Sequence, residues 1–153
     1  MMKQRQTMAG FTLLELMIVV MVVAILATVA FPSYTRALKK SHRGDATTTL
    51  LQIAQKQEAY YARNAIYANN FSDLGFDSSV LVASKVVSQE GYYQVSNAAP
   101  SVNSYVLVAN VTDLDGQDSD EIKRFRLLST GLREHSLVTS GDADEDWDDG
   151  WTE

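Results

Sequence analysis

The chain has 153 residues, no cysteine and a formal net charge of −6 at pH 7. A chain of this length supports one small domain in addition to any membrane segment. Without cysteines no disulfide can hold that domain together, and the acidic balance disfavours general binding to the phosphate backbone of nucleic acids.

An apolar stretch runs from Phe11 to Phe31 and is followed by Pro32. As a helix it would measure roughly 31 Å at about 1.5 Å per residue, which matches the ~30 Å hydrocarbon core of a bilayer. It contains one carboxylate, Glu15, and a charge at the bilayer centre costs roughly 2.5–3.5 kcal/mol. The stretch predicts a membrane-spanning helix in which Glu15 is either an interfacial acid tolerated by chance or the partner of a cation supplied from elsewhere.

At the N-terminus a short basic leader ends in Gly10, the sequence Phe11-Thr-Leu-Leu-Glu15 follows, and the apolar helix has Pro32 just beyond it. This order of features resembles that of type IV prepilins. The resemblance implies that prepilin peptidase cleaves between Gly10 and Phe11 and that the new amine of Phe11 is N-methylated. It also implies that Glu15 pairs with the Phe11 amine of a neighbouring subunit, and that Glu15 and Pro32 serve filament assembly. Such a buried pair favours the correct register, because removing one partner leaves an uncompensated charge.

The N-terminus also allows two other interpretations, an ordinary secretory signal and a helix with the opposite orientation. An ordinary secretory signal usually has an apolar core of ~7–15 residues before a small-x-small cleavage site, whereas this core is longer and contains Glu15. A positive-inside count places the C-terminal part in the cytoplasm, since several basic residues follow the helix. The prepilin signature places it outside, and we follow the signature: a single-pass inner-membrane protein with its head in the periplasm, and later a surface pilus.

Four segments are expected along the chain. Residues 1–10 form the leader, 11–32 the transmembrane and assembly helix, 33–63 an amphipathic helix of the head, and 64–153 a loop, a β-meander and an acidic C-terminal loop. The amphipathic helix is predicted by apolar positions at three- and four-residue steps, with Gly44 as a weak point. These positions are Ala46, Leu50, Ile53, Ala54, Gln57 and Tyr61.

The remaining sequence predicts an ordered loop and then strands. Tyr67, Phe71 and Phe76 are expected to pin the loop that follows the helix. Runs rich in β-branched and aromatic residues predict four antiparallel strands at 92–96, 104–111, 122–128 and 132–138. In the third run Arg124 and Arg126 flank Phe125, which is typical of a sheet with one solvated face. The fold class is α+β, and the resemblance implies the type IV pilin fold: a long N-terminal helix on a four-stranded antiparallel sheet.

The head is similar to minor pilins of the PilE and ComP kind in Ser41–Ala46, in Leu50–Tyr61 and between Tyr67 and Phe76. These relatives often carry cysteines near the last strands, which this chain lacks. Its acidic end, Asp142–Glu153, therefore cannot be held by a disulfide. We favour anchoring of this end on the head by Trp147 or Trp151 over a contact of these residues with another pilin.

Candidate chemistry elsewhere is sparse. Asp113–Glu121 is rich in acids, but Gly116 and Arg124 stand at the wrong places for a calcium-binding EF-hand, so a solvated acidic turn is favoured and no metal or cofactor is expected. His42 and His135 are interpreted as surface residues. No nucleophile motif or phosphate-binding loop is visible, which predicts a protein without enzymatic activity.

The sequence therefore predicts a structural subunit of a type IV pilus, more specifically a minor pilin that serves pilus assembly in twitching, adhesion or DNA uptake. Its expected partners are other major and minor pilins, prepilin peptidase and, before assembly, the inner membrane. One alternative is a ComP-like DNA receptor for natural transformation, with possible DNA contacts at Lys123, Arg124, Arg126 and Arg133. A third candidate is a pseudopilin of a type II secretion system.

Overall fold

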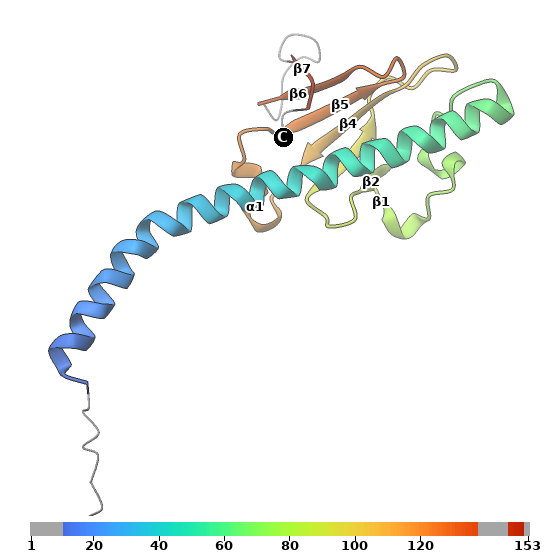
Figure 1. The fold of residues 1–153 in the computed structure, drawn as a ribbon. Coiled ribbons are helices and arrows are strands. Elements are labelled where there is room, and N and C mark those ends of the chain that lie inside the picture. The colour runs from blue at the N-terminus through green and yellow to red at the C-terminus, as the bar shows by residue number, and fades with distance from the viewer. Residues whose placement is uncertain (1–10, 138–146, 152–153) are drawn as a thin grey trace, which may run out of the picture. The chain divides into compact units, whose positions relative to one another are not determined.

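The computed structural model describes residues 11–137 and 147–151. The chain divides into an N-terminal part that ends at Ala37 and a head that begins at Leu38. One helix, α1 (Leu13–Asn64), contributes to both parts (Figure 1). The predicted leader with Gly10, and Asp142–Asp146 of the acidic end, lie outside the described residues.

Helix α1 begins with a side-chain cap at Thr12. The Thr12 hydroxyl oxygen accepts a hydrogen bond from the backbone N–H of Glu15 at 3.2 Å, which satisfies one of the free donors of the first turn. Thr12 and Glu15 have the spacing of a capping box, and an acid in the first turn interacts favourably with the helix dipole. The helix continues through Pro32, and none of residues 11–37 is buried.

In the head, α1 presents a buried stripe to the sheet. Ala46, Thr49, Leu50, Ile53 and Gln57 are its buried residues, at the three- and four-residue steps that keep side chains on one face. This confirms the predicted amphipathic helix, which runs through Gly44 as regular helix. At its end Tyr61 is 40% exposed and stacks on Tyr67 with ring centroids 4.6 Å apart.

A seven-stranded sheet completes the head, with all strands antiparallel and in chain order. Its strands are β1 (Leu81–Val82), β2 (Lys85–Val87), β3 (Tyr93–Asn97), β4 (Val106–Val111), β5 (Arg124–Leu128), β6 (Arg133–Ser136) and β7 (Asp148–Asp149). The four predicted strands correspond to β3–β6. The predicted number of four was wrong because β1, β2 and β7 are too short to show a two-residue period.

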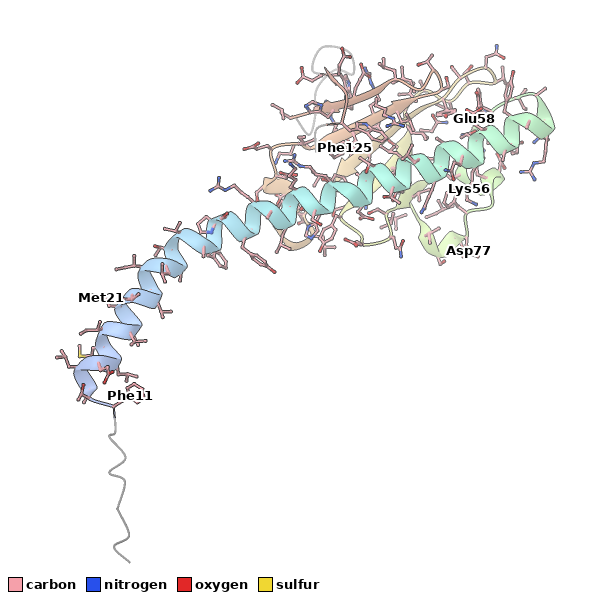
Figure 2. All side chains as sticks on the ribbon, in the orientation of Figure 1. Phe11, Met21, Lys56, Glu58, Asp77 and Phe125 are labelled. Atoms are coloured by element: carbon pink, nitrogen blue, oxygen red, sulfur yellow. The ribbon has the colours of Figure 1, made fainter. Side chains whose placement is uncertain are left out.

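The strand register sorts side chains into an inner and an outer face. Val95, Ala109 and Phe125 lie opposite one another across β3, β4 and β5, and all three are fully buried. They belong to the core that contains the buried stripe of α1. Figure 2 shows Phe125 on the side of the sheet that α1 covers. Since the head core draws no residue from before Ala46, it is built within the head alone.

The loop after α1 is tied down by one buried amide. The Gln57 side chain donates to the carbonyl of Ala68 at 2.8 Å and accepts from the Ala68 N–H at 2.9 Å. Phe71 opens a short 3₁₀ helix (Phe71–Leu74) and is 5% exposed. The prediction of an ordered loop held by aromatic residues is confirmed. Gln57 was placed on the correct face from spacing, but its bonds to the loop were not predicted.

The turn between β1 and β2 is strained. Val82 pairs with Lys85, so Ala83 and Ser84 alone form the connection. Both have positive φ angles, 49° and 63°. Two-residue hairpins of this kind favour Asn and Gly, and a left-handed conformation costs other residues roughly 1–2 kcal/mol each.

Candidate assembly and binding surfaces

The N-terminal part of α1 is an apolar surface that its own chain leaves uncovered. Phe11 is 85% exposed, and the large aliphatic residues that follow it up to Val29 are between 49% and 77% exposed. By length and composition this helix can cross a membrane. Figure 2 shows the side chains of Phe11 and Met21 projecting from it.

Glu15 and Pro32, the predicted assembly positions, both lie in this part of the helix. Among the described residues, no cation lies within ion-pair distance of the Glu15 carboxylate. The Pro32 carbonyl accepts hydrogen bonds from the Thr35 hydroxyl at 3.1 Å and from Arg36 Nε at 3.3 Å. Glu15 is thus an exposed acid in an apolar helix, and Arg36 folds back on its own helix.

In the head, basic residues of α1 hold the acidic turn. This turn forms a 3₁₀ helix, η3 (Leu114–Ser119), followed by Asp120. Lys39 Nζ contacts the Ser119 hydroxyl, and Arg43 forms two hydrogen bonds of 2.8 Å with Asp120. Among the described residues, no three metal-binding side chains form a group that could hold an ion. The interpretation as a solvated acidic turn agrees with the exposed Asp113, Asp118 and Glu121, but it was wrong at Asp120, which is 6% exposed.

Gln117 links this turn to the sheet and to the helix. It is 1% exposed, and its Nε2 donates to the backbone carbonyl of Lys39 and to the Tyr93 hydroxyl, both at 3.2 Å. Its Oε1 accepts from His42 Nδ1 at 2.9 Å, and the His42 ring stacks on Tyr92 with centroids 3.7 Å apart. His42 was interpreted as a surface residue; it is half-buried, and its ring is held by Gln117 on one side and Tyr92 on the other.

The second histidine anchors the C-terminal strand. His135 is 8% exposed, so its interpretation as a surface residue was also wrong. Its Nδ1 donates to the carbonyl of Gly150 at 2.9 Å, and β7 pairs with β6 through His135 and Asp148. Trp151 packs against the core and donates from Nε1 to the carbonyl of Arg126 at 3.2 Å. The expected anchoring by tryptophan is confirmed for Trp151.

Of the four residues proposed for DNA contact, two lie under another side chain. Trp147 lies over the guanidinium groups of Arg124 and Arg126, with distances of 4.8 and 4.4 Å to its ring centroid. Arg124 is 7% exposed, and Arg126 Nε forms an ion pair of 2.6 Å with Glu134. The prediction that these arginines lie on a solvated face was therefore wrong, because the C-terminal segment covers that part of the sheet.

The other two residues, Lys123 and Arg133, make different contacts. Arg133 is exposed, and its guanidinium lies 4.9 Å from the ring centroid of Trp151. Lys123 is half-buried and donates to the carbonyl of Asp118. The structure therefore separates the predicted set into a pair under Trp147, Arg124 and Arg126, and a second pair, Lys123 and Arg133, of which Arg133 is exposed.

A family model described as "Type IV minor pilin ComP, DNA uptake sequence receptor" matches residues 32–121 of the chain. The chain belongs to this family of type IV minor pilins. A second model, the prokaryotic N-terminal methylation motif, matches residues 5–31 of the pilin. The two matches meet at Pro32, so the N-terminal helix and most of the head are both accounted for.

Individual relatives agree with the family. The pilin is 32% identical over 92 residues to the type IV major pilin protein PilA of Myxococcus xanthus, a match that covers 59% of the pilin and 42% of that protein. It is 30% identical over 79 residues to the type II secretion system core protein G of Vibrio cholerae, covering 52% of the pilin and 53% of that protein. The matched region thus spans about half the length of these relatives or less.

A solved structure confirms the fold. The non-core minor pilin PilV of Neisseria meningitidis superposes with a TM-score of 0.50 at 20% identity, over 72% of the pilin and 98% of that chain. The predicted α+β pilin fold is therefore correct, with seven strands in place of four.

Proposed function

We propose that the pilin is a structural minor subunit of a type IV pilus. The observation that carries this proposal is the N-terminal part of α1, an uncovered apolar surface with a single acid in its first turn. In the membrane, lipid covers this surface, and in a filament the corresponding helices of neighbouring pilins replace the lipid. The head is then periplasmic before assembly and lies on the filament surface afterwards.

Processing at Gly10 and Phe11 supplies the cation that Glu15 lacks. Prepilin peptidase cuts between these residues, and the new amine of Phe11 is methylated but keeps its charge. In the filament the amine of one subunit pairs with Glu15 of the next. Because the pair forms only between subunits, a wrong register leaves both charges buried and uncompensated.

Mass spectrometry of sheared filaments and of membranes tests this proposal directly. We expect an N-terminal peptide that begins at methylated Phe11, found in the filament fraction at low abundance relative to other pilins. An intact leader, or cleavage near Ala30, would contradict the proposal, since the apolar segment would then be an anchor or a secretory signal.

Two variants separate the charge of Glu15 from its place in the helix cap. Glu15→Gln removes the charge but keeps a residue that suits the third position of a capping box. Thr12→Val removes the hydroxyl that accepts the Glu15 N–H bond and keeps the charge. If the charge sets register, Glu15→Gln lowers incorporation into filaments at least tenfold, while Thr12→Val leaves most of it. Equal incorporation of wild type and Glu15→Gln contradicts the proposed role.

DNA reception is the second candidate function, and the match to the ComP family model favours it. Of the four predicted contacts we assign Arg133 and Lys123 as the primary ones, because Trp147 covers the other two. The logarithm of the DNA-binding constant falls linearly with the logarithm of the salt concentration, and each phosphate contact that is lost reduces the steepness of this fall by about 1. We expect Arg133→Gln and Lys123→Gln to lower the slope, and the matched control Arg63→Gln, at the end of α1, to leave it unchanged. A salt slope that is the same in all three variants contradicts DNA contact at these residues.

A pseudopilin role is the third candidate, supported by the similarity to the secretion protein of Vibrio cholerae. The same mass-spectrometric experiment distinguishes it. A pilus subunit is recovered with sheared surface pili, whereas a secretion pseudopilin stays with the membrane fraction.

A further inference from the structure

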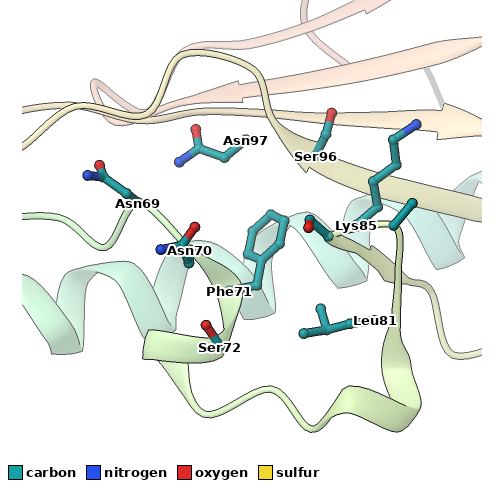
Figure 3. Close-up of a pocket in the computed structure, with 10 residues that line it drawn as sticks. Asn69, Asn70, Phe71, Ser72, Leu81, Lys85, Ser96 and Asn97 are labelled. Carbon is teal, nitrogen blue, oxygen red and sulfur yellow. The ribbon is translucent and has the colours of Figure 1, made fainter.

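A hollow of about 350 Å³ opens in the head between the loop after α1 and the β1–β2 turn (Figure 3). This volume falls within the ~300–1,000 Å³ of small-molecule sites. Asn69, Asn70 and Ser72 lie on one side and Lys85 on the opposite side, and Ser84 and Phe71 also line the hollow. Among the described residues, the lining contains no carboxylate.

Asn97, at the end of β3, places an unused donor group in the wall of this hollow. Its Oδ1 accepts from the backbone N–H of Val106 at 3.3 Å, which fixes the orientation of the amide. Its Nδ2 is buried and has no hydrogen-bond partner in the described part of the chain. Buried polar groups are rarely left without a partner, so this amide is prepared to donate to something in the hollow.

Lys85 supplies the only formal charge among the residues that line the hollow. Within the described ranges, no acid lies at ion-pair distance from its ammonium group. The β1–β2 turn places it there, because Lys85 directly follows Ala83 and Ser84, which both hold left-handed conformations. In a protein of net charge −6 the hollow is thus a local site for one negative charge.

We propose that this hollow binds a sugar-sized, hydroxylated ligand with one carboxylate, of the class of the uronic acids. Amides and hydroxyls both donate and accept, so they match the paired donor and acceptor character of sugar hydroxyls. The half-buried Leu81 offers an apolar surface to the C–H face of a ring. A polyanion would need several cations and a metal ion would need carboxylates, and the lining provides neither. The proposal is independent of the assembly role, which concerns the other end of α1.

The test is a titration of the full chain in sugar-free detergent micelles, followed by amide NMR. The probes are galacturonate, galactose and inorganic phosphate. We expect galacturonate to shift the backbone signals of residues 69–72 and 83–85 and the side-chain amide signal of Asn97. Galactose should shift the same signals with roughly tenfold weaker affinity, because it lacks the charge.

Matched variants make the result specific. Lys85→Gln should reduce the affinity for galacturonate to that for galactose. Asn97→Asp keeps the oxygen that accepts from Val106 but loses the donor, so it should abolish galacturonate binding and weaken galactose binding. The controls Lys40→Gln on α1 and Asn103→Ala in the β3–β4 loop, both exposed positions, should bind both sugars as the wild type does.

Three results would overturn the proposal. Galacturonate could shift none of the named signals, or phosphate could bind as tightly as galacturonate, which would mean a simple anion site. Binding could also persist unchanged in both Lys85→Gln and Asn97→Asp. Each variant is first checked for an unchanged amide spectrum outside the hollow, so that a loss of binding reports on the site and not on folding.

Discussion

Arg43 on α1 and Asp120 after η3 are joined by two parallel hydrogen bonds of 2.8 Å from the guanidinium to both carboxylate oxygens. The two side chains are 14% and 6% exposed. The hydrogen bond to Asp120 raises the pKa of Arg43 above its ordinary value. The pair fixes the acidic turn to the helix, so Arg43 serves the head internally and is not available as a free basic residue.

Removing one partner of this pair should destabilise the head. We expect Asp120→Ala to lower the free energy of unfolding by about 3 kcal/mol, because a largely buried guanidinium loses its counter-ion. The midpoint of thermal unfolding should fall by roughly 10 °C or more, measured by near-UV circular dichroism. Arg63→Ala is the control, since Arg63 is exposed and bonds only to the carbonyl of Ala59 among the described residues. Equal midpoints in the two variants would contradict the structural role of the pair.

Trp151 should hold the C-terminal strand in place of the disulfide that this chain lacks. Trp151→Ala removes the core contact and the bond to the Arg126 carbonyl, at a cost of about 2 kcal/mol for this half-buried ring. The Gly150 N–H, which bonds to the Arg133 carbonyl at 2.7 Å, should then exchange its hydrogen at least tenfold faster. Trp151→Phe keeps an aromatic ring but not the Nε1 donor, so the exchange rate at Gly150 should lie between those of the wild type and Trp151→Ala. Unchanged protection at Gly150 in Trp151→Ala would show that strand pairing alone holds β7.

The β1–β2 turn offers a stabilising substitution. Replacing Ala83-Ser84 by Asn-Gly removes two left-handed positions from residues that disfavour them, and should stabilise the head by about 1 kcal/mol. Thermal unfolding measures the gain. The control is Ala98→Gly in the β3–β4 loop, where no positive φ angle exists to relieve. A lower midpoint for the Asn-Gly variant would mean that the turn does not need the left-handed conformation.

Stability should decline at alkaline pH because of Tyr93. Burial raises the pKa of its hydroxyl from 10.0 to about 12. Because the pKa of Tyr93 is higher in the folded state than in the unfolded state, its contribution to the free energy of unfolding is complete below pH 10. This contribution is lost as the pH rises from 10 to about 12. The loss is roughly 1.4 kcal/mol for each pH unit in that window. Tyr93→Phe should remove this one-proton contribution, so that the free energy of unfolding falls less steeply with pH than in the wild type. Unfolding experiments at successive pH values measure this slope. A slope equal to that of the wild type would contradict the assignment.

The sequence alone determined the long helix, its apolar first half and the buried stripe of its second half. These features depend on local spacing, which a three- to four-residue period reveals without knowledge of the partner. Strands β3–β6 were predictable for the same reason, since each is long enough to show its character. The order of Gly10, Phe11 and Glu15 is also a local pattern, and it indicates the family without any tertiary structure.

Only the tertiary structure decided which polar residues are accessible. Arg43 and Asp120 are far apart in the sequence, as are Gln117 and Lys39, so no local pattern could reveal their hydrogen bonds. Strands of two residues, such as β1 and β7, exist because a neighbouring strand offers its backbone groups. Arg124 lost its expected solvent exposure for the same physical reason: Trp147, distant in sequence, lies over it, and burial depends on the whole fold while periodicity depends on the segment.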